Sequence, residues 1–413
     1  MEQLINPIRP YAWGSRTVIA ELLGESVPSP HPQAEMWLGA HPQDPSSLAG
    51  PGGRCSLLDV LRADPDGQLG PLRVHRWSGT LPYLLKVLAA DEPLSLQAHP
   101  SLEQAGEGFD REDAAGLPRD AVDRNYRDAN HKPELICALT PMNALVGFRD
   151  PVGTVRLLHA LAVPELEPHA QLLAAEPNAG GLRALFTTWI TLPQSVLDRL
   201  VPALAAGAAR LAENPDDTSG AGEFGAVAGT VLDLARRYPG DAGVLAAVLL
   251  NRVTLAPGEA VFLPAGNLHA YLSGAGVELM ANSDNVLRGG LTPKHVDVPE
   301  LLRVLDFTFG PPPIDRGRPD GAGWLCYDTP IEEFLLRRWE APDGGSGSGP
   351  VAVPDGGPRI MLCTAGKAVL RGSAGDLEIG RGQAAWLAAG DLSVTVHDAA
   401  GGTQLFLAGD ALG

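Results

Sequence analysis

The chain has 413 residues, more than one hydrophobic core usually organises, so two or three domains are expected. Its 31 Lys and Arg residues against 49 Asp and Glu residues give a net charge of -18, which argues against general binding to nucleic acid or to an anionic membrane surface. Any phosphate site must therefore be a local cationic pocket.

Signals for export and for disulfides are missing from the sequence. The N-terminal segment has no basic stretch followed by an apolar one, and no uninterrupted apolar run is long enough to span a membrane. The cysteines Cys55, Cys137, Cys326 and Cys363 are far apart and form no CxxC pair. These observations predict reduced thiols and a cytoplasmic location.

The first part of the chain, residues 1–149, is predicted to be mostly β, because short apolar runs alternate with Gly, Pro and Asn. Within it, Leu94–Pro100 reads LSLQAHP. Alternate residues of a strand point to the same face, so Gln97 and His99 are expected to face one barrel interior together.

The segment Tyr126–Glu134 reads YRDANHKPE. Pro133 disfavours a helical conformation at Lys132, so the segment is predicted to be extended. Lys132 and Glu134 then share a face, while His131 points the other way. This geometry places Lys132 better than His131 for contact with a substrate.

Further along the chain, Leu and Ala recur at helical spacing between residues 151 and 250, which predicts a helical insertion. The β pattern returns after it. We therefore expect a mainly β protein with an α-helical insertion, in which residues 1–150 and 251–315 form one discontinuous domain. Residues 316–413 form a separate C-terminal domain.

The stretch His269–Lys294 reads HAYLSGAGVELMANSDNVLRGGLTPK. It places a metal-type histidine and acidic residues near Arg288 in one short span, which indicates metal-assisted sugar-phosphate chemistry. Arginine stays protonated and offers a planar set of donors, so Arg288 suits an enediolate or a phosphate better than a lysine does.

Together, these three segments closely resemble the type I mannose-6-phosphate isomerases of the cupin superfamily. The resemblance extends to PYAWG at Pro10–Gly14 and to AEMWLGAHP at Ala34–Pro42. The residues that fit the second cupin motif are Gly258, Pro264, Gly266 and His269, with Ser273 in place of the motif's final Asn.

A second set of glycines, Gly382 and Gly390, repeats the motif spacing near the C-terminus. There Ala388 replaces the motif proline and Ser393 replaces the motif histidine. The resemblance therefore implies two cupin-like jelly-roll barrels, of which only the first binds metal.

For the metal, the resemblance implies one Zn2+ per chain, held by Gln97, His99, His269 and a carboxylate. Two glutamates compete for the last place. Glu103 has the spacing of the first cupin motif, whereas Glu134 lies in the segment that matches the family in detail. The resemblance favours Glu134.

The activity that the resemblance implies is the reversible interconversion of mannose 6-phosphate and fructose 6-phosphate through a cis-enediolate stabilised by the metal, a link to GDP-mannose biosynthesis. The catalytic candidates are Arg288, Lys132 and His131, and the substrate-binding candidates are Ser95, Lys86, Lys294, Glu278, Asp284 and Trp13, with Glu35 at the pocket wall. The general base stays open among Lys132, His131, Glu278 and Asp284.

Two other functions are compatible with these residues. The chain could isomerise another aldose or aldose phosphate, or it could be a non-catalytic cupin that only binds sugar or metal. The contexts of Arg288 and Lys132 favour an enzyme, because a binding protein needs no group that stabilises an enediolate. The expected partner is a small sugar phosphate, with no nucleic acid and no membrane, and the chain is expected to be a monomer.

Overall fold

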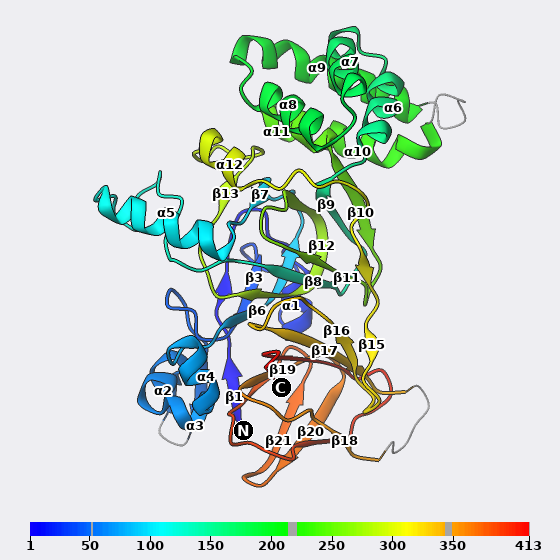
Figure 1. The fold of residues 1–413 in the computed structure, drawn as a ribbon. Helices are drawn as coiled ribbons and strands as arrows, with labels where there is room; N and C mark the ends of the chain where they lie inside the picture. The colour runs from blue at the N-terminus through cyan, green and yellow to red at the C-terminus, as the bar shows by residue number, and fades with distance from the viewer. Residues whose placement is uncertain (51–52, 214–220, 343–348, 413) are drawn as a thin grey trace.

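The computed structural model describes residues 1–50, 53–213, 221–342 and 349–412. Figure 1 shows a helical region at one end, a central β region, and a second β region that holds both chain termini. The fold class expected from the sequence, mainly β with a helical insertion and cupin-like barrels, is confirmed by this arrangement.

The central barrel is an antiparallel sheet of 11 strands built around one long strand, β12 (His269–Ala281). One half of β12 pairs with β6 (Tyr83–Ala90) and β8 (Glu134–Ala138), and the other half pairs with β7 (Gln97–Ala98) and β9 (Met142–Phe148). The remaining strands are β2 (Ile8–Arg9), β3 (Glu35–Leu38), β10 (Leu250–Leu255), β11 (Ala260–Leu263), β13 (Leu287–Arg288) and β14 (Ile314–Asp315).

Every residue of β6 is buried, because its two faces contact different parts of the protein. One face lines the central barrel, and the other packs into a core shared with the second β region, where Leu85 and Val87 meet Leu362 and Phe406. The strand is therefore fixed from both sides, which holds any polar residue on its inner face in a defined position.

The helical region runs from Pro151 to Val248 in the described chain, close to the predicted insertion. Asp150 caps its first helix through Gly153, and Pro151 takes the first helical position, where a missing N–H does no harm. The helices are α6 (Pro151–Leu161), α7 (Glu167–Ala175), α8 (Ala179–Ile190), α9 (Gln194–Glu213), α10 (Ala221–Arg237) and α11 (Ala242–Val248), with a 3-10 turn, η1, at Pro164–Leu166.

The apolar faces of these helices and one end of the central barrel share a single core. Leu96 and Ala98 beside β7, Leu268 before β12, and Leu287 of β13 all belong to it. Figure 1 shows this end of the barrel, with β7 and β13, lying toward the helices. The short strands β7 and β13 are thus held in place by the helical region.

The second β region takes strands from both ends of the chain. Its nine-stranded sheet has the order β15-β16-β17-β24-β19-β22-β1-β4-β5, and a four-stranded sheet, β18-β23-β20-β21, accompanies it. The strands are β1 (Glu2–Ile5), β4 (Ser47–Gly50), β5 (Gly53–Ser56), β15 (Arg318–Pro319), β16 (Leu325–Tyr327), β17 (Leu335–Glu340), β18 (Val351–Ala352), β19 (Arg359–Ala365), β20 (Lys367–Gly372), β21 (Gly375–Gly380), β22 (Ala384–Leu387), β23 (Thr395–His397) and β24 (Gln404–Gly409).

Some N-terminal strands therefore lie in the same sheet as the strands of the predicted C-terminal domain. Strand β1 lies between β22 and β4, so residues 2–5, 47–50 and 53–56 extend the sheet of the C-terminal strands. Side-chain alternation identifies a strand but carries no information on a partner hundreds of residues away. The domain boundaries themselves stay a prediction.

Residues 1–149 also contain helices that the β pattern did not predict. They are α1 (Val18–Leu23), α2 (Leu57–Ala63), α3 (Pro65–Leu69), α4 (Pro71–Trp77) and α5 (Leu102–Ala114), and a further short helix, α12, spans Val298–Val304. Most of them are too short to show helical periodicity. Helix α5 does begin with a capping box formed by Ser101 and Gln104, a signal that the sequence carries.

A buried polar contact joins α4 to the C-terminal strands. Arg73 donates two hydrogen bonds of 3.0 Å to the carboxylate of Asp410, and the Tyr83 hydroxyl of β6 donates to the Pro358 carbonyl at 2.9 Å. These contacts attach the start of β6 to the second β region.

Among the helices that the structure describes, none combines the length and the apolarity needed to cross a membrane.

Candidate functional site

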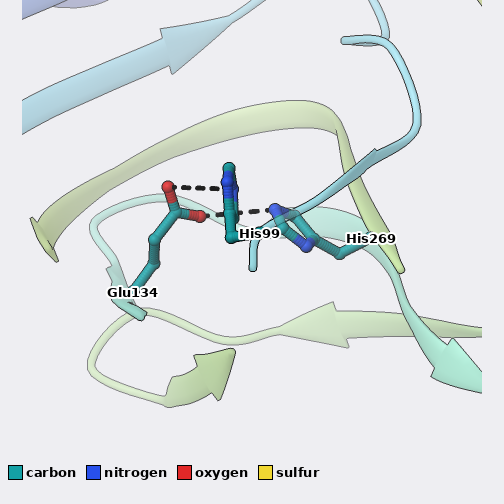
Figure 2. Close-up of side chains that lie close together, drawn as sticks. All are labelled: His99, Glu134 and His269. Carbon is teal, nitrogen blue, oxygen red and sulfur yellow. Dashed lines mark ion pairs between the residues drawn. The ribbon is translucent and has the colours of Figure 1, made fainter. Parts of the chain in front are cut away.

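Three buried side chains, His99, Glu134 and His269, converge inside the central barrel (Figure 2). Glu134 Oε1 lies 3.4 Å from His99 Nε2, and Glu134 Oε2 lies 3.3 Å from His269 Nε2. The candidate ligand atoms all lie within 4.8 Å of one another. The carboxylate at this site is therefore Glu134, while Glu103 lies exposed on α5.

A tight turn brings the two histidines together. Gly266 donates its N–H to the His99 carbonyl at 2.8 Å and has a φ of +76°, a value that suits glycine. A Cβ atom there would lie 2.9 Å from the backbone of Val304 and of Asp306, so no larger residue fits. Gly266, a glycine of the sequence motif, thus allows the start of β12 to lie next to His99.

The outer nitrogens of both rings have carbonyl partners. His99 Nδ1 lies 2.7 Å from the Asn285 carbonyl, and His269 Nδ1 lies 3.0 Å from the Asn267 carbonyl. A carbonyl only accepts, so each Nδ1 carries a proton, and in the neutral ring the lone pair belongs to Nε2, which is turned toward Glu134. His99 Nε2 is buried without a hydrogen-bond partner, which is the state expected of a ligand nitrogen.

Protonation in this site suits a metal ligand set. Burial lowers the pKa of His99 to about 4, so the imidazole is neutral near pH 7. Burial opposes ionisation of Glu134, but His99 and Lys132 outweigh it and hold the pKa of that carboxyl well below its usual range. Two imidazoles and one carboxylate are a donor set that Zn2+ accepts, so the residues present fit this ion.

Gln97 and Arg288 flank the histidines across neighbouring strands. In β7, Gln97 lies opposite His269 of β12 on one side and opposite Arg288 of β13 on the other. Residues directly opposite each other in antiparallel strands point to the same face. The side chains of Gln97 and Arg288 therefore start on the face that carries His269.

A cluster of cations, which we call the cation trio, consists of Arg127, Arg288 and Lys294. Burial, and then the nearby Arg127, lower the pKa of Arg288. Partial burial together with Arg288 and Arg127 lowers the pKa of Lys294. None of the three forms an ion pair with a carboxylate in the described ranges, although the chain has many more acidic than basic residues.

Mutually repelling cations without carboxylate partners are suited to bind an anion. The sequence reasoning selected Arg288 and Lys294 but missed Arg127, which lies in the same YRDANHKPE segment as Lys132. The positive charge of Arg127 and its position in that segment were the features of the sequence that could have identified it as an anion-binding residue. Ser95, the other expected phosphate contact, is half-buried beside β7.

Lys86 does not belong to the cation trio. Its ammonium group contacts two buried carboxylates instead. Its Nζ lies 3.2 Å from Glu278 Oε2 and 3.7 Å from Glu35 Oε1, and Trp37 lies under it at 5.6 Å. Burial alone would lower the pKa of Lys86, but Glu35 and Glu278 raise it above its ordinary value. Lys86 is therefore protonated and forms ion pairs with these two carboxylates.

Glu278 and Asp284, two of the candidate bases, already have protein partners. Glu278 accepts a 2.9 Å hydrogen bond from the Tyr271 hydroxyl besides its contact with Lys86, and burial raises its pKa. Asp284 accepts a 2.8 Å hydrogen bond from Gln43 and lines a cavity of about 570 Å³ that Arg127 also lines.

Trp13, a candidate for the pocket wall, stacks on Tyr11 with ring centroids 5.7 Å apart and packs at the edge of the barrel core.

The extended segment before β8 separates the two remaining candidates. Lys132 Nζ lies 3.4 Å from Glu134 Oε1, on the side of the metal-type cluster. His131 faces the other way, and its Nε2 lies 2.8 Å from Glu333 Oε1 in the C-terminal region. The structure therefore brings Lys132 to the cluster and does not bring His131 there.

At the C-terminal copy of the motif, Ala388 and Ser393 lie in the turn after β22. Ser393 has a φ of +55°, and its N–H donates to Asp355 at 3.0 Å. Within the residues that the structure describes, a metal-type cluster of His, Cys, Asp and Glu is found only at His99, Glu134 and His269.

Comparisons with known proteins place these features in a family. Residues 1–151 match the family model of the phosphomannose isomerase type I catalytic domain. The mannose-6-phosphate isomerase of Escherichia coli K12 is 37% identical over 403 residues, which cover 96% of this chain and 97% of that protein. The mannose-6-phosphate isomerase of Bos taurus is 35% identical over 368 residues, 81% of each chain.

Solved structures of this family match the fold of this chain over its full length. The crystal structure of the Salmonella typhimurium mannose 6-phosphate isomerase bound to fructose 6-phosphate and zinc has a TM-score of 0.87 and 34% sequence identity, and the match covers 100% of both chains. A zinc-bound structure of mannose 6-phosphate isomerase matches with the same TM-score of 0.87 over 100% of this chain and 99% of that one. The chain belongs to the type I phosphomannose isomerase family.

Proposed function

We propose that this protein is a mannose-6-phosphate isomerase that interconverts mannose 6-phosphate and fructose 6-phosphate through a cis-enediolate. The observation that carries the proposal is the placement of Arg288 on the same barrel face as the cluster of His99, Glu134 and His269, one strand away from it. The names of the relatives and the fructose 6-phosphate in the Salmonella structure support the same substrate pair.

The metal ligands in this proposal are Gln97, His99, Glu134 and His269, and they hold one ion per chain; zinc is the metal in the zinc-bound neighbour. When bound there, zinc supplies a Lewis acid that stabilises negative charge on the sugar oxygens. The protein's part is to keep both histidines neutral and oriented through their carbonyl partners, and to exclude water by burial.

The cation trio provides the electrostatic part of the site. Arg127 and Lys294 bind the phosphate, with Ser95 as an added hydroxyl donor. Arg288 lies nearest the metal ligands in the strand register, so its guanidinium is assigned to the oxygen that becomes negative as the enediolate forms. A phosphate fixed at one end of the sugar would hold C1 and C2 beside Lys132.

For the proton that moves between C1 and C2, Lys132 is the favoured group. Its Nζ lies beside Glu134, whereas His131 is bound to Glu333 and both oxygens of Glu278 contact protein groups. Asp284 lies on the cavity wall and is the second choice. Lys86, Trp13 and Glu35 shape the pocket wall in this assignment.

The test is a coupled assay that detects fructose 6-phosphate formed from mannose 6-phosphate, before and after chelation and with zinc added back. Loss of turnover on chelation and recovery with zinc are expected, together with exchange of the C2 proton of the substrate with water. Parallel assays with other aldoses and aldose phosphates test the alternative substrates. A protein that binds zinc and sugar phosphate without turnover or proton exchange would be a binding protein instead.

We further propose that the enzyme acts as a monomer in the cytoplasm. The unpaired state of Cys55, Cys137, Cys326 and Cys363 supports a reducing compartment. Size-exclusion chromatography with light scattering tests the monomer, since a dimer would double the measured mass.

A further inference from the structure

Asn285 is a completely buried asparagine between β12 and β13, and its amide is fully used. Its Oδ1 accepts hydrogen bonds from the backbone N–H groups of Arg127 at 2.7 Å and Asp128 at 3.3 Å. Its Nδ2 donates to the carbonyls of Asp128 at 2.7 Å and Asn130 at 2.9 Å. Because N–H groups lie on one side and carbonyls on the other, the amide fits in one orientation only.

The backbone of the same residue touches the metal-type cluster. The Asn285 carbonyl is the partner of His99 Nδ1 at 2.7 Å, and the Asn285 N–H donates to Ser283 Oγ at 3.2 Å. Ser283 in turn donates to Asp128 Oδ1 at 2.8 Å. One residue thus holds a histidine ligand through its main chain and the segment 127–130 through its side chain.

That segment connects the two halves of the site. Arg127, at its start, belongs to the cation trio, and Lys132 and Glu134 follow it before β8. A shift of the segment would move an anion-binding cation and a carboxylate ligand at once. Truncating the Asn285 side chain would leave the backbone N–H and C=O groups of the segment without their buried partners.

We infer that Asn285 is a positioning residue that couples the orientation of the His99 ligand to the placement of Arg127. The part that concerns phosphate rests on the proposed function, whereas the part that concerns metal affinity does not. Partners outside the ligand shell that orient a metal-binding histidine commonly change metal affinity by roughly tenfold to a hundredfold when they are lost.

The test is the Asn285→Ala variant, compared with an asparagine that makes a similar set of bonds elsewhere. Asn251 is half-buried, and its Nδ2 lies 2.9 to 3.2 Å from the carbonyl oxygens of Val146, Gly147, Phe148 and Gly310, so Asn251→Ala controls for the loss of an amide that bonds main-chain carbonyls. Zinc affinity is measured by competition with a chelator, and the exchange of the amide hydrogens of residues 127–130 by mass spectrometry.

For Asn285→Ala we expect zinc affinity to fall at least about tenfold, faster amide exchange at residues 127–130, and a raised KM for mannose 6-phosphate at saturating zinc. For Asn251→Ala we expect zinc affinity close to that of the natural protein. If Asn285→Ala does not fold, Ser283→Ala should give a smaller loss in the same direction.

Zinc affinity within about twofold of the natural protein in the folded Asn285→Ala variant, or an equal loss in Asn251→Ala, would overturn the inference. In the Ser283→Ala variant, unchanged zinc affinity and unchanged exchange would do the same. A natural protein that binds zinc but does not turn over mannose 6-phosphate would refute the proposed function and leave the zinc comparison valid.

Discussion

At the scale of single residues, the ligand cluster depends on each Nε2 atom having no proton. Both His99 and His269 achieve this through a backbone carbonyl at Nδ1, so the tautomer is set by the chain itself. The same contacts orient both rings with Nε2 toward Glu134, as metal binding by these residues would require.

A first prediction concerns the carboxylate ligand. Glu134→Gln should release zinc and abolish turnover, because the buried carboxylate balances the charge of the ion, whereas Glu103→Gln should keep zinc, since Glu103 lies exposed on α5. His99→Ala and His269→Ala should also lose zinc. Metal analysis of the purified variants checks this, and a full complement of zinc in any of the three ligand variants would remove that residue from the site.

A second prediction separates Arg288 from Lys294. Arg288→Ala should lower kcat by roughly a hundredfold to a thousandfold, the usual loss for a preorganised donor to a developing negative charge. Lys294→Ala should act mainly on KM, since a phosphate contact made in both ground state and transition state leaves kcat nearly unchanged. Steady-state kinetics with mannose 6-phosphate distinguish the two. A raised KM with intact kcat in Arg288→Ala would reassign that arginine to the phosphate.

Sequence reasoning reached the metal-type residues because their chemistry and spacing are distinctive, and it reached the opposite directions of Lys132 and His131 because Pro133 enforces an extended chain. It could not find Glu333 as the partner of His131, since that contact joins distant parts of the chain. It also could not see that Lys86 turns toward Glu35 and Glu278, because register between strands decides which charges meet.

At the scale of elements, two of the shortest strands hold residues that we propose for the site. Strands β7 and β13 place Gln97 and Arg288, and both are too short for any pattern to predict. Their geometry comes from β12 and from the helical core that covers them. The long, periodic elements of the insertion were predictable, whereas the short helices α1 to α4 were not, because so few residues show no period.

A third prediction concerns the turn after β22. Because Ala388 and Ser393 stand where the motif has proline and histidine, the second barrel should hold no zinc, and the intact protein should bind about one zinc per chain, as one ligand set predicts. Metal analysis of the purified protein after removal of loosely bound ions measures this. Two tightly bound ions per chain would require a second set of ligands.

At the scale of the whole molecule, the two β regions are joined through β6, which carries Lys86 on one face and packs against C-terminal strands on the other. The second region thus supports the strand that holds Lys86 in the wall of the central barrel. Sequence composition predicted that more than one domain exists, but the way in which the domains share a core depends on three-dimensional contacts that no local pattern contains.

A fourth prediction tests this junction. Asp410→Asn should destabilise the protein by about 3–5 kcal/mol, because it removes the negative charge of the buried carboxylate that accepts two hydrogen bonds from Arg73. Replacing both residues by apolar ones, as Arg73→Met with Asp410→Leu, should restore much of the loss. Urea unfolding followed by fluorescence measures both changes. Equal stability of Asp410→Asn and the natural protein would show that the pair contributes nothing to the junction.

The position of β1 has a consequence for synthesis on the ribosome. Residues 2–5 are synthesised hundreds of residues before one of their two partners, β22, which spans Ala384–Leu387. The nascent chain can pair β1 with β4 early, but the other edge of β1 must stay open until β22 has been synthesised. An open strand edge can pair with other chains, so β1 is exposed to misassociation during synthesis until β22 covers it.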